Sequence, residues 1–325
     1  AILQEKKTPL GIVGFAITAF IISLIILPGS GSGTMLYILL TVVCAIHFEI
    51  ISFKGSDNLA VPFGTALFFY ATHGKDFNTV WITAVILAMA LVSILLYRSG
   101  VLTRNGAIAA HLLGVYIFGL LGPEWGIPVA FFFVTSVIFT RVNGMVNRKW
   151  HGPGRRNIWQ VAANIIIGVV FSILYLMSAQ TIFIFLYISV VAAVTADTWA
   201  SEVGPVFHRK CFSLSGWRTA AAGVSGGISF AGTLAAIAGS LLVTMLAWAG
   251  FFPGMDLRAI LILALAGFLA SFIDSALGAF VEPRLIAWAW FRKRKGSESI
   301  SPNDVVNLLA SLSAPMFYFL LNAII

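Results

Sequence analysis

The sequence predicts an all-α integral membrane protein built as a polytopic helical bundle. The chain is 59% hydrophobic and only 10% charged, whereas an ordinary soluble domain is about 25% charged. Apolar runs of about twenty residues, the length of a membrane-spanning helix, recur along the whole chain. A membrane β-barrel would show alternating strands of about ten residues, so the pattern excludes that class.

About eleven apolar segments are long enough to be considered as spans. They cover approximately residues 9–27, 34–53, 59–72, 79–97, 106–121, 127–142, 158–178, 181–200, 219–249, 257–281 and 303–324. The third and fifth are short for a span, so we expect them to be tilted, broken or re-entrant. The ninth is too long for one straight helix, and we expect it to be broken near Gly223–Gly232.

The basic residues predict the orientation of the chain. With these crossings, every Lys and Arg except Lys75 and Arg258 falls on one side of the membrane. Basic loops stay in the cytoplasm, so the N-terminus is expected to be cytoplasmic. The net charge of +8 is divided among many short loops, which argues against a nucleic-acid partner. We expect a bacterial inner (plasma) membrane location.

Three acids lie at the predicted cytoplasmic ends of two spans. Asp197 and Glu202 end the eighth span, and Asp274 lies inside the tenth. A carboxylate within a span costs at least about 2.5–3.5 kcal/mol, so Asp197 and Asp274 require partners or a bound cation. Carboxylates and hydroxyls without a nearby Cys or His cluster suit Mg²⁺. Asp197, Glu202 and Asp274 are therefore the predicted metal ligands and catalytic residues.

Other polar motifs converge on the same side and predict a phosphate site. The stretch GVSGGISFAG opens the ninth span, and glycines that expose backbone N–H groups at a helix start suit phosphate, although glycines also serve helix packing. Arg156, Gln160 and Asn164 are spaced by four and share a helix face, where the two amides could instead bridge helices. The predicted phosphate- or nucleotide-binding residues are Gly223, Ser225, Gly226, Gly227, Arg141, Arg155, Arg156, Gln160, Asn164, Ser201, Ser275 and Asn307.

Five motifs in this order resemble one known family. They are LTRNGAIAAHLLG, RRNIWQVAAN, ADTWASEVGP, GVSGGISFAGT and DSALGA. Their combination resembles the domain of unknown function 92 family, which includes transmembrane protein 19 and the plant and cyanobacterial phytyl-phosphate kinases. The resemblance covers about residues 98–325, which we predict to be the catalytic membrane domain. Residues 1–97 are predicted to form a four-span accessory region.

The resemblance implies an enzyme that phosphorylates an isoprenyl monophosphate, such as phytyl phosphate, to the diphosphate. It implies CTP or another nucleoside triphosphate as donor, Mg²⁺ as cofactor and the bilayer as surroundings; the oligomeric state is not predicted. The family motifs fall on Asp197, Ser201, Glu202, Asp274 and the glycines of the ninth segment. Two alternatives stay open, a CTP:lipid-phosphate cytidylyltransferase and a secondary transporter, because transporters also contain broken spans and intramembrane acids.

Overall fold

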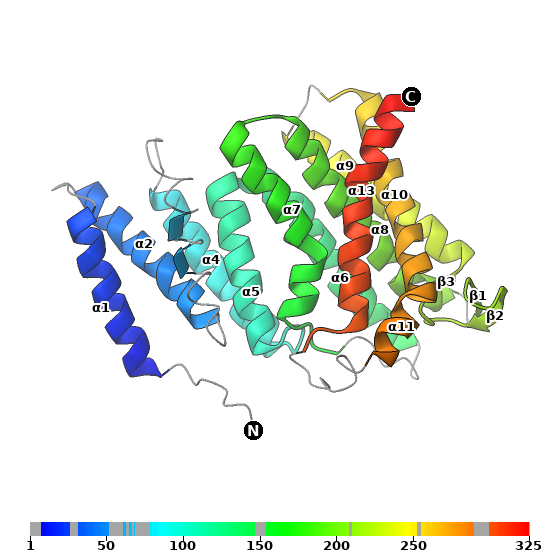
Figure 1. The fold of residues 1–325 in the computed structure, drawn as a ribbon, viewed down its shortest axis with the longest axis horizontal. Coiled ribbons are helices and arrows are strands. Elements are labelled where there is room, and N and C mark those ends of the chain that lie inside the picture. Colours follow the sequence, from blue (N-terminus) through cyan, green and yellow to red (C-terminus); the bar gives the residue numbers. More distant parts are fainter. Residues whose placement is uncertain are drawn as a thin grey trace. The chain divides into compact units, whose positions relative to one another are not determined.

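The structure is a computed structural model that describes most of the chain. The described residues are 8–26, 32–51, 61–62, 65–66, 68, 79–146, 154–207, 210–251, 255–288 and 299–324. The chain forms two compact units, one of residues 1–95 and 108–122 and the other of residues 96–107 and 123–325. Figure 1 labels their elements, and each unit is treated by itself below.

The first unit contains helices that bury few of their side chains. Its elements are α1 (Pro9–Ile26), α2 (Ser32–Ile51), most of α4 (Thr79–Arg98), the end of α5 (Arg104–Gly114) and the π-helix η1 (Val115–Leu121). Leu40, Phe68 and Ile82 form its core. Helix α1 is apolar on every side and buries none of its residues. Because an apolar surface of that size requires a non-aqueous solvent, lipid is expected around α1.

Helix α5 and η1 together form one continuous span of 18 residues, Arg104–Leu121. Two glycines let this segment approach α4 closely. A Cβ at Gly114 would lie 2.5 Å from Met89 Sδ, and one at Gly119 would overlap Ile82 Cδ1. The short fifth segment is therefore helical throughout, and its second half is wound as a π-helix.

The second unit is a bundle arranged around one buried helix. Its helices are α6 (Pro123–Val146), α7 (Ile158–Ser178), α8 (Ile182–Phe207), α9 (Phe230–Phe251), α10 (Leu257–Phe280), α11 (Glu282–Ala287) and α13 (Pro302–Ile324). Helix α8 packs against α6, α7, α9, α10 and α13. Its most apolar window is 72% buried, against at most 39% in the other candidate spans. The apolar part of α8 is therefore covered by neighbouring helices.

Polar anchors and small residues fix α8 among its neighbours. The Tyr187 hydroxyl donates to the Trp125 carbonyl (2.7 Å), and Trp199 Nε1 donates to Thr135 Oγ1 (3.0 Å). A Cβ at Gly267 of α10 would lie 2.6 Å from Ala192 Cβ, so the two helices touch at their backbones. The end of α8 that carries Asp197 and Glu202 is therefore held firmly by the surrounding helices.

A small antiparallel sheet, absent from our prediction, connects α8 to α9. Strands β1 (Lys210–Ser213), β2 (Arg218–Ala221) and β3 (Gly227–Ile228) lie in the order β2–β1–β3. The predicted break in the ninth segment is confirmed, but its first part is strand and turn, and α9 begins only at Phe230. Gly223 (φ 86°) and Gly226 (φ 72°) supply the left-handed backbone of the turn between β2 and β3.

The all-α integral membrane class is confirmed. Nine helices among the described residues are long and apolar enough to cross a membrane, and α2 adds a shorter apolar stretch, Thr34–Ile46. The predicted third segment, 59–72, lies mostly outside the described residues. The total of eleven spans and the cytoplasmic N-terminus remain predictions.

Candidate functional site

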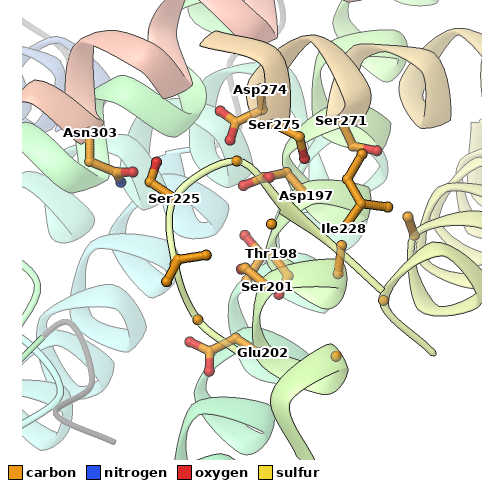
Figure 2. Close-up of a pocket in the computed structure, with 18 of the residues that line it drawn as sticks. Asp197, Thr198, Ser201, Glu202, Ser225, Ile228, Ser271, Asp274, Ser275 and Asn303 are labelled. Atoms are coloured by element: carbon orange, nitrogen blue, oxygen red, sulfur yellow. Dashed lines mark hydrogen bonds between the residues drawn. The ribbon is translucent and has the colours of Figure 1, made fainter. Parts of the chain in front are cut away.

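A pocket opens where five helices of the second unit meet at one end. Most of its lining residues come from the beginnings of α7, α9 and α13, the ends of α8 and α10, and the loop between β2 and β3. The cavity measures about 530 Å³, a volume typical of small-molecule sites. Figure 2 shows acids, hydroxyls and a backbone loop around this space. The helices alternate in direction, so residues far apart in sequence come together here.

Asp197 of α8 and Asp274 of α10 form a pair of carboxyl groups in this pocket. Their side chains lie within hydrogen-bonding reach of each other. The amide nitrogen of Asn307, in the orientation that satisfies its neighbours, donates to Asp274 Oδ1 (3.2 Å). Ser271 and Ser275 line the same wall. Two adjacent carboxylates repel unless a proton or a cation lies between them, so this pair is a natural binding position for a hard cation.

Glu202 lies in the same pocket but belongs to a different polar cluster. Its Oε1 accepts a hydrogen bond from Thr140 Oγ1 (2.6 Å), and its Oε2 accepts one from Asn143 Nδ2 (3.2 Å). The side chain is only 5% exposed. Among the described residues, no three His, Cys, Asp or Glu side chains converge to hold a metal ion. Of the three predicted metal ligands, Asp197 and Asp274 lie together, and Glu202 in the same pocket accepts hydrogen bonds from Thr140 and Asn143. Their role as metal ligands stays a prediction.

Arg156 is the cation of this second cluster and is fixed through both its backbone and its side chain. Its N–H donates to the Val101 carbonyl, and its carbonyl accepts from the Thr103 N–H, both at 3.0 Å. Its Nη2 donates to Ser136 Oγ (2.5 Å) and Thr140 Oγ1 (3.3 Å). Burial lowers the pKa of the Arg156 guanidinium, and the negative charge of Glu202 raises it. Arg156 is the one Lys or Arg among the described residues that line the pocket.

The glycine-rich loop lies directly against the end of α10. A Cβ at Gly226 would lie 2.5 Å from Ala279 Cβ, and one at Gly278 would lie 2.6 Å from Ser225 Oγ. A Cβ at Gly226 would also meet the Ala279 backbone, and one at Gly278 would require Ser225 to shift, which explains the glycines on both sides. The Gly227 N–H is used within the turn, through a hydrogen bond to the Val224 carbonyl (3.1 Å). A bound phosphate would therefore be met by the amides that precede Gly227.

Sequence reasoning missed Glu282, which begins α11 and lines the pocket. The Ser225 hydroxyl donates a hydrogen bond to its carboxylate, so this acid connects the glycine-rich loop to the end of α10. The signal was present in the sequence, because Glu282 follows Asp274 by two helical turns and precedes a proline suited to a helix start. Asn303 and Ser301 at the start of α13 also line the pocket without having been predicted.

The predicted site residues divide into those that line the pocket and two that do not. Gln160 closes a capping box at the start of α7, where its Oε1 accepts from the Asn157 N–H (3.0 Å). Arg141 and Arg155 are exposed and do not line the pocket. All the predicted site residues except Arg141 and Arg155 line the pocket. They are Asp197, Glu202, Asp274, Gly223, Ser225, Gly226, Gly227, Arg156, Gln160, Asn164, Ser201, Ser275 and Asn307.

The fold and the site define a helical integral membrane protein with an acidic, amide- and glycine-lined pocket at one end of its bundle. Comparison with known protein families identifies the family of this chain. The family described as "Integral membrane protein DUF92" matches residues 87–314, more than half of the chain. The chain belongs to this family.

Three relatives span organisms from archaea to plants. An uncharacterized membrane protein of Methanocaldococcus jannaschii is 28% identical over 70% of this chain and 88% of its own length. An uncharacterized membrane protein of Synechocystis sp. is 28% identical over 70% of this chain and 85% of its own length. Protein PGR of Arabidopsis thaliana is 28% identical over 62% of this chain and 78% of its own length. No solved structure matches the chain.

Proposed function

We propose that this protein is a membrane lipid kinase that transfers the terminal phosphoryl group of CTP, or of another nucleoside triphosphate, to an isoprenyl monophosphate. The observation that carries the proposal is the pocket's composition. A carboxylate pair, a glycine-rich loop and one fixed arginine line the same cavity at the end of a membrane bundle. The resemblance of the five motifs to the phytyl-phosphate kinases supports the same reaction.

The reaction brings two polyanions together, and the site's task is to neutralise and align them. An oxygen of the lipid phosphate attacks the γ-phosphorus of the nucleotide, the bond to the β-phosphate oxygen breaks, and the nucleoside diphosphate leaves. A phosphate monoester is already largely ionised at pH 7, so no strong base is needed. Charge neutralisation and in-line positioning are then the main catalytic contributions.

The Asp197–Asp274 pair fits Mg²⁺ by the chemistry of its donors. Two carboxylates beside the Asn307 amide and two serine hydroxyls offer hard oxygen ligands of the kind that magnesium prefers. Magnesium, when bound with the nucleotide, would neutralise the negative charge on the phosphate oxygens. Asp197 and Asp274 would hold it, and Asn307 would keep the Asp274 carboxylate in position.

Arg156 and the glycine-rich loop would bind the phosphates. In our proposal Arg156 contacts the acceptor phosphate, and the amides of the glycine-rich loop contact the nucleotide phosphates. Glu202 then takes a different role from the one predicted. Through Thr140, which contacts both side chains, it holds Arg156 in place instead of binding metal. Gln160 and Asn164 are left to orient phosphate oxygens or ribose.

The position of the pocket suits a lipid substrate. It opens at the helix ends that adjoin the basic loops, which the positive-inside rule assigns to the cytoplasm. An isoprenyl tail would lie along the apolar helices, and its phosphate would enter at the interface. A transporter would instead be expected to place its polar groups near the bilayer midplane.

The decisive test uses purified full-length protein with Mg²⁺, γ-labelled CTP and a panel of isoprenyl monophosphates. A labelled lipid diphosphate together with CDP supports the kinase. Pyrophosphate with a CDP-linked lipid identifies the cytidylyltransferase instead. Solute flux in sealed vesicles without nucleotide consumption identifies a transporter. Either of the last two results overturns the proposal.

A further inference from the structure

The sheet between α8 and α9 has one buried face and one exposed aromatic face. Along β1, Cys211 and Ser213 are buried, whereas Lys210 and Phe212 are exposed. Trp217 in the turn after β1 packs edge-on against Phe212, with ring centroids 5.8 Å apart. Phe212 is 43% exposed and Trp217 is 76% exposed. Two large aromatic rings therefore cover each other only in part, and most of the Trp217 side chain stays exposed.

The sheet extends sideways from the bundle. Strand β3 packs against α10, β1 follows it, and β2 forms the outer edge. Because neighbouring strands lie about 4.8 Å apart, β2 is displaced by roughly 10 Å from β3. Figure 1 shows β1 and β2 beside the bundle at the level of α11, where the pocket-lining helix ends also lie. In a bilayer, a sheet placed this way would extend over the lipids that surround the helices.

Short connections hold the sheet close to the ends of two candidate membrane-spanning helices. Strand β1 begins at Lys210, soon after α8 ends at Phe207, and α9 begins at Phe230, just after β3 ends at Ile228. At 3.3–3.6 Å per residue, the sheet lies within roughly 10 Å of two spanning helices. The phenylalanines at those helix ends, Phe207 and Phe230, are 70% and 74% exposed. This distance corresponds to the headgroup layer of a bilayer.

We propose that Phe212, Trp217 and Lys210 form an interfacial anchor, which binds the anionic phospholipid headgroups of the protein's own bilayer. Tryptophan favours this layer because it has an apolar ring and one polar N–H. Lys210 lies on the same face as Phe212, two residues away, and supplies the positive charge that anionic headgroups attract. Lipid is the occupant that matches both the aromatic and the basic part of the face.

The anchor has a consequence for the pocket. Cys211, on the opposite face of β1, lines the cavity, and a Cβ at Gly227 of β3 would lie 2.6 Å from its sulfur. The same strand therefore contacts lipid on one side and forms a pocket wall on the other. Anchoring the outer face fixes the pocket at the depth of the lipid headgroups. This inference does not depend on which reaction the pocket performs.

The test is ¹⁹F NMR of full-length protein labelled with 5-fluorotryptophan in lipid nanodiscs. Trp217→Phe identifies the Trp217 signal, and the buried Trp125 and Trp199 serve as internal references. With headgroup-nitroxide lipid added, we expect loss of the Trp217 signal while the reference signals persist. A signal lost to a water-soluble gadolinium chelate but kept with the labelled lipid would show a solvated face. A signal kept in both would show protein cover. Either result overturns the anchor.

The anionic preference is tested separately by Lys210→Gln. In the wild-type protein, the loss of the Trp217 signal should increase as phosphatidylglycerol replaces phosphatidylcholine, and Lys210→Gln should abolish that dependence. Arg284→Gln is the matched control, because Arg284 is an exposed basic residue on α11 and its loss should leave the dependence unchanged. An unchanged dependence in Lys210→Gln overturns the assignment to anionic lipid.

Discussion

The two acidic regions of the pocket differ in what their carboxylates contact. Glu202 is surrounded by donors, because Thr140 and Asn143 occupy its two oxygens and Arg156 lies one hydroxyl away. Asp197 instead meets another acid, Asp274, with the Asn307 amide beside it. A fully hydrogen-bonded acid contributes to the structure, whereas adjacent acids need a proton or a cation between them. One cavity therefore contains a supporting cluster, formed by Glu202, Thr140, Asn143 and Arg156, and a separate cation-binding position at the Asp197–Asp274 pair.

The largest effect is expected at the aspartate pair. Asp274→Asn should lower lipid-phosphate kinase turnover by at least about 10³-fold, the scale of charge-stabilising groups in phosphoryl transfer. It should not reduce thermal stability, because it removes one of two repelling carboxylates. Turnover with labelled CTP and unfolding in detergent measure the two effects. Near wild-type turnover would exclude Asp274 from the reaction. Leu261→Ala, at an exposed position of the same helix outside the pocket lining, is the control for a change that keeps both acids.

The supporting cluster should behave differently. Glu202→Ala leaves the Thr140 and Asn143 donors without their acceptor and removes the negative charge that acts on Arg156. Unsatisfied buried groups of this kind cost about 1–3 kcal/mol of stability each. We expect a lower melting temperature together with a moderate loss of kcat/KM for the lipid phosphate. If Glu202→Ala instead abolishes turnover at full stability and changes the Mg²⁺ requirement, Glu202 is a metal ligand, and the distinction between the two regions fails.

The contrast between these regions also marks the limit of what the sequence predicts. The depth of each acid in a span follows from hydropathy, and the alternation of spans correctly placed Asp197, Glu202 and Asp274 at one end of the bundle. Which donors surround an acid depends on helix rotation and packing. Thr140 and Asn143 are a full helix away in the chain, on α6. No periodicity connects them to Glu202, so the sequence grouped all three acids together.

The sheet shows a second limit. Hydropathy treats residues 219–249 as one apolar segment, because small residues such as Ala220 and Gly227 are equally compatible with a span. The left-handed conformations of Gly223 and Gly226 and the pairing of Phe212 with both Thr219 and Ile228 decide the outcome. Strand pairing of this kind is a long-range contact, and a local window does not contain it. The glycines were predicted as site residues, but their turn was not.

The glycine-rich loop should show the next largest effect. Gly226→Ala adds a methyl group where φ is 72° and where Ala279 leaves no space; the left-handed backbone alone costs an alanine roughly 1–2 kcal/mol. We expect the loop to shift and the KM for the nucleotide to rise. Gly144→Ala is the matched control, because its added Cβ would meet nothing within 4 Å. Equal kinetics for the two variants would separate the loop from nucleotide binding.

The smallest effect is expected where the loop meets α11. Glu282→Ala removes the acceptor of the Ser225 hydroxyl, and a hydrogen bond of this kind contributes about 0.5–1.5 kcal/mol. The KM for the nucleotide should therefore rise by at most about tenfold, because 1.4 kcal/mol corresponds to one factor of ten. Glu282→Gln keeps an acceptor and should retain most of the affinity. If Glu282 acts by holding Ser225, adding Ser225→Ala to Glu282→Ala should cause little further loss. Additive losses, or a Gln variant as impaired as the Ala variant, would show that Glu282 acts through its charge and belongs with the Asp197–Asp274 region.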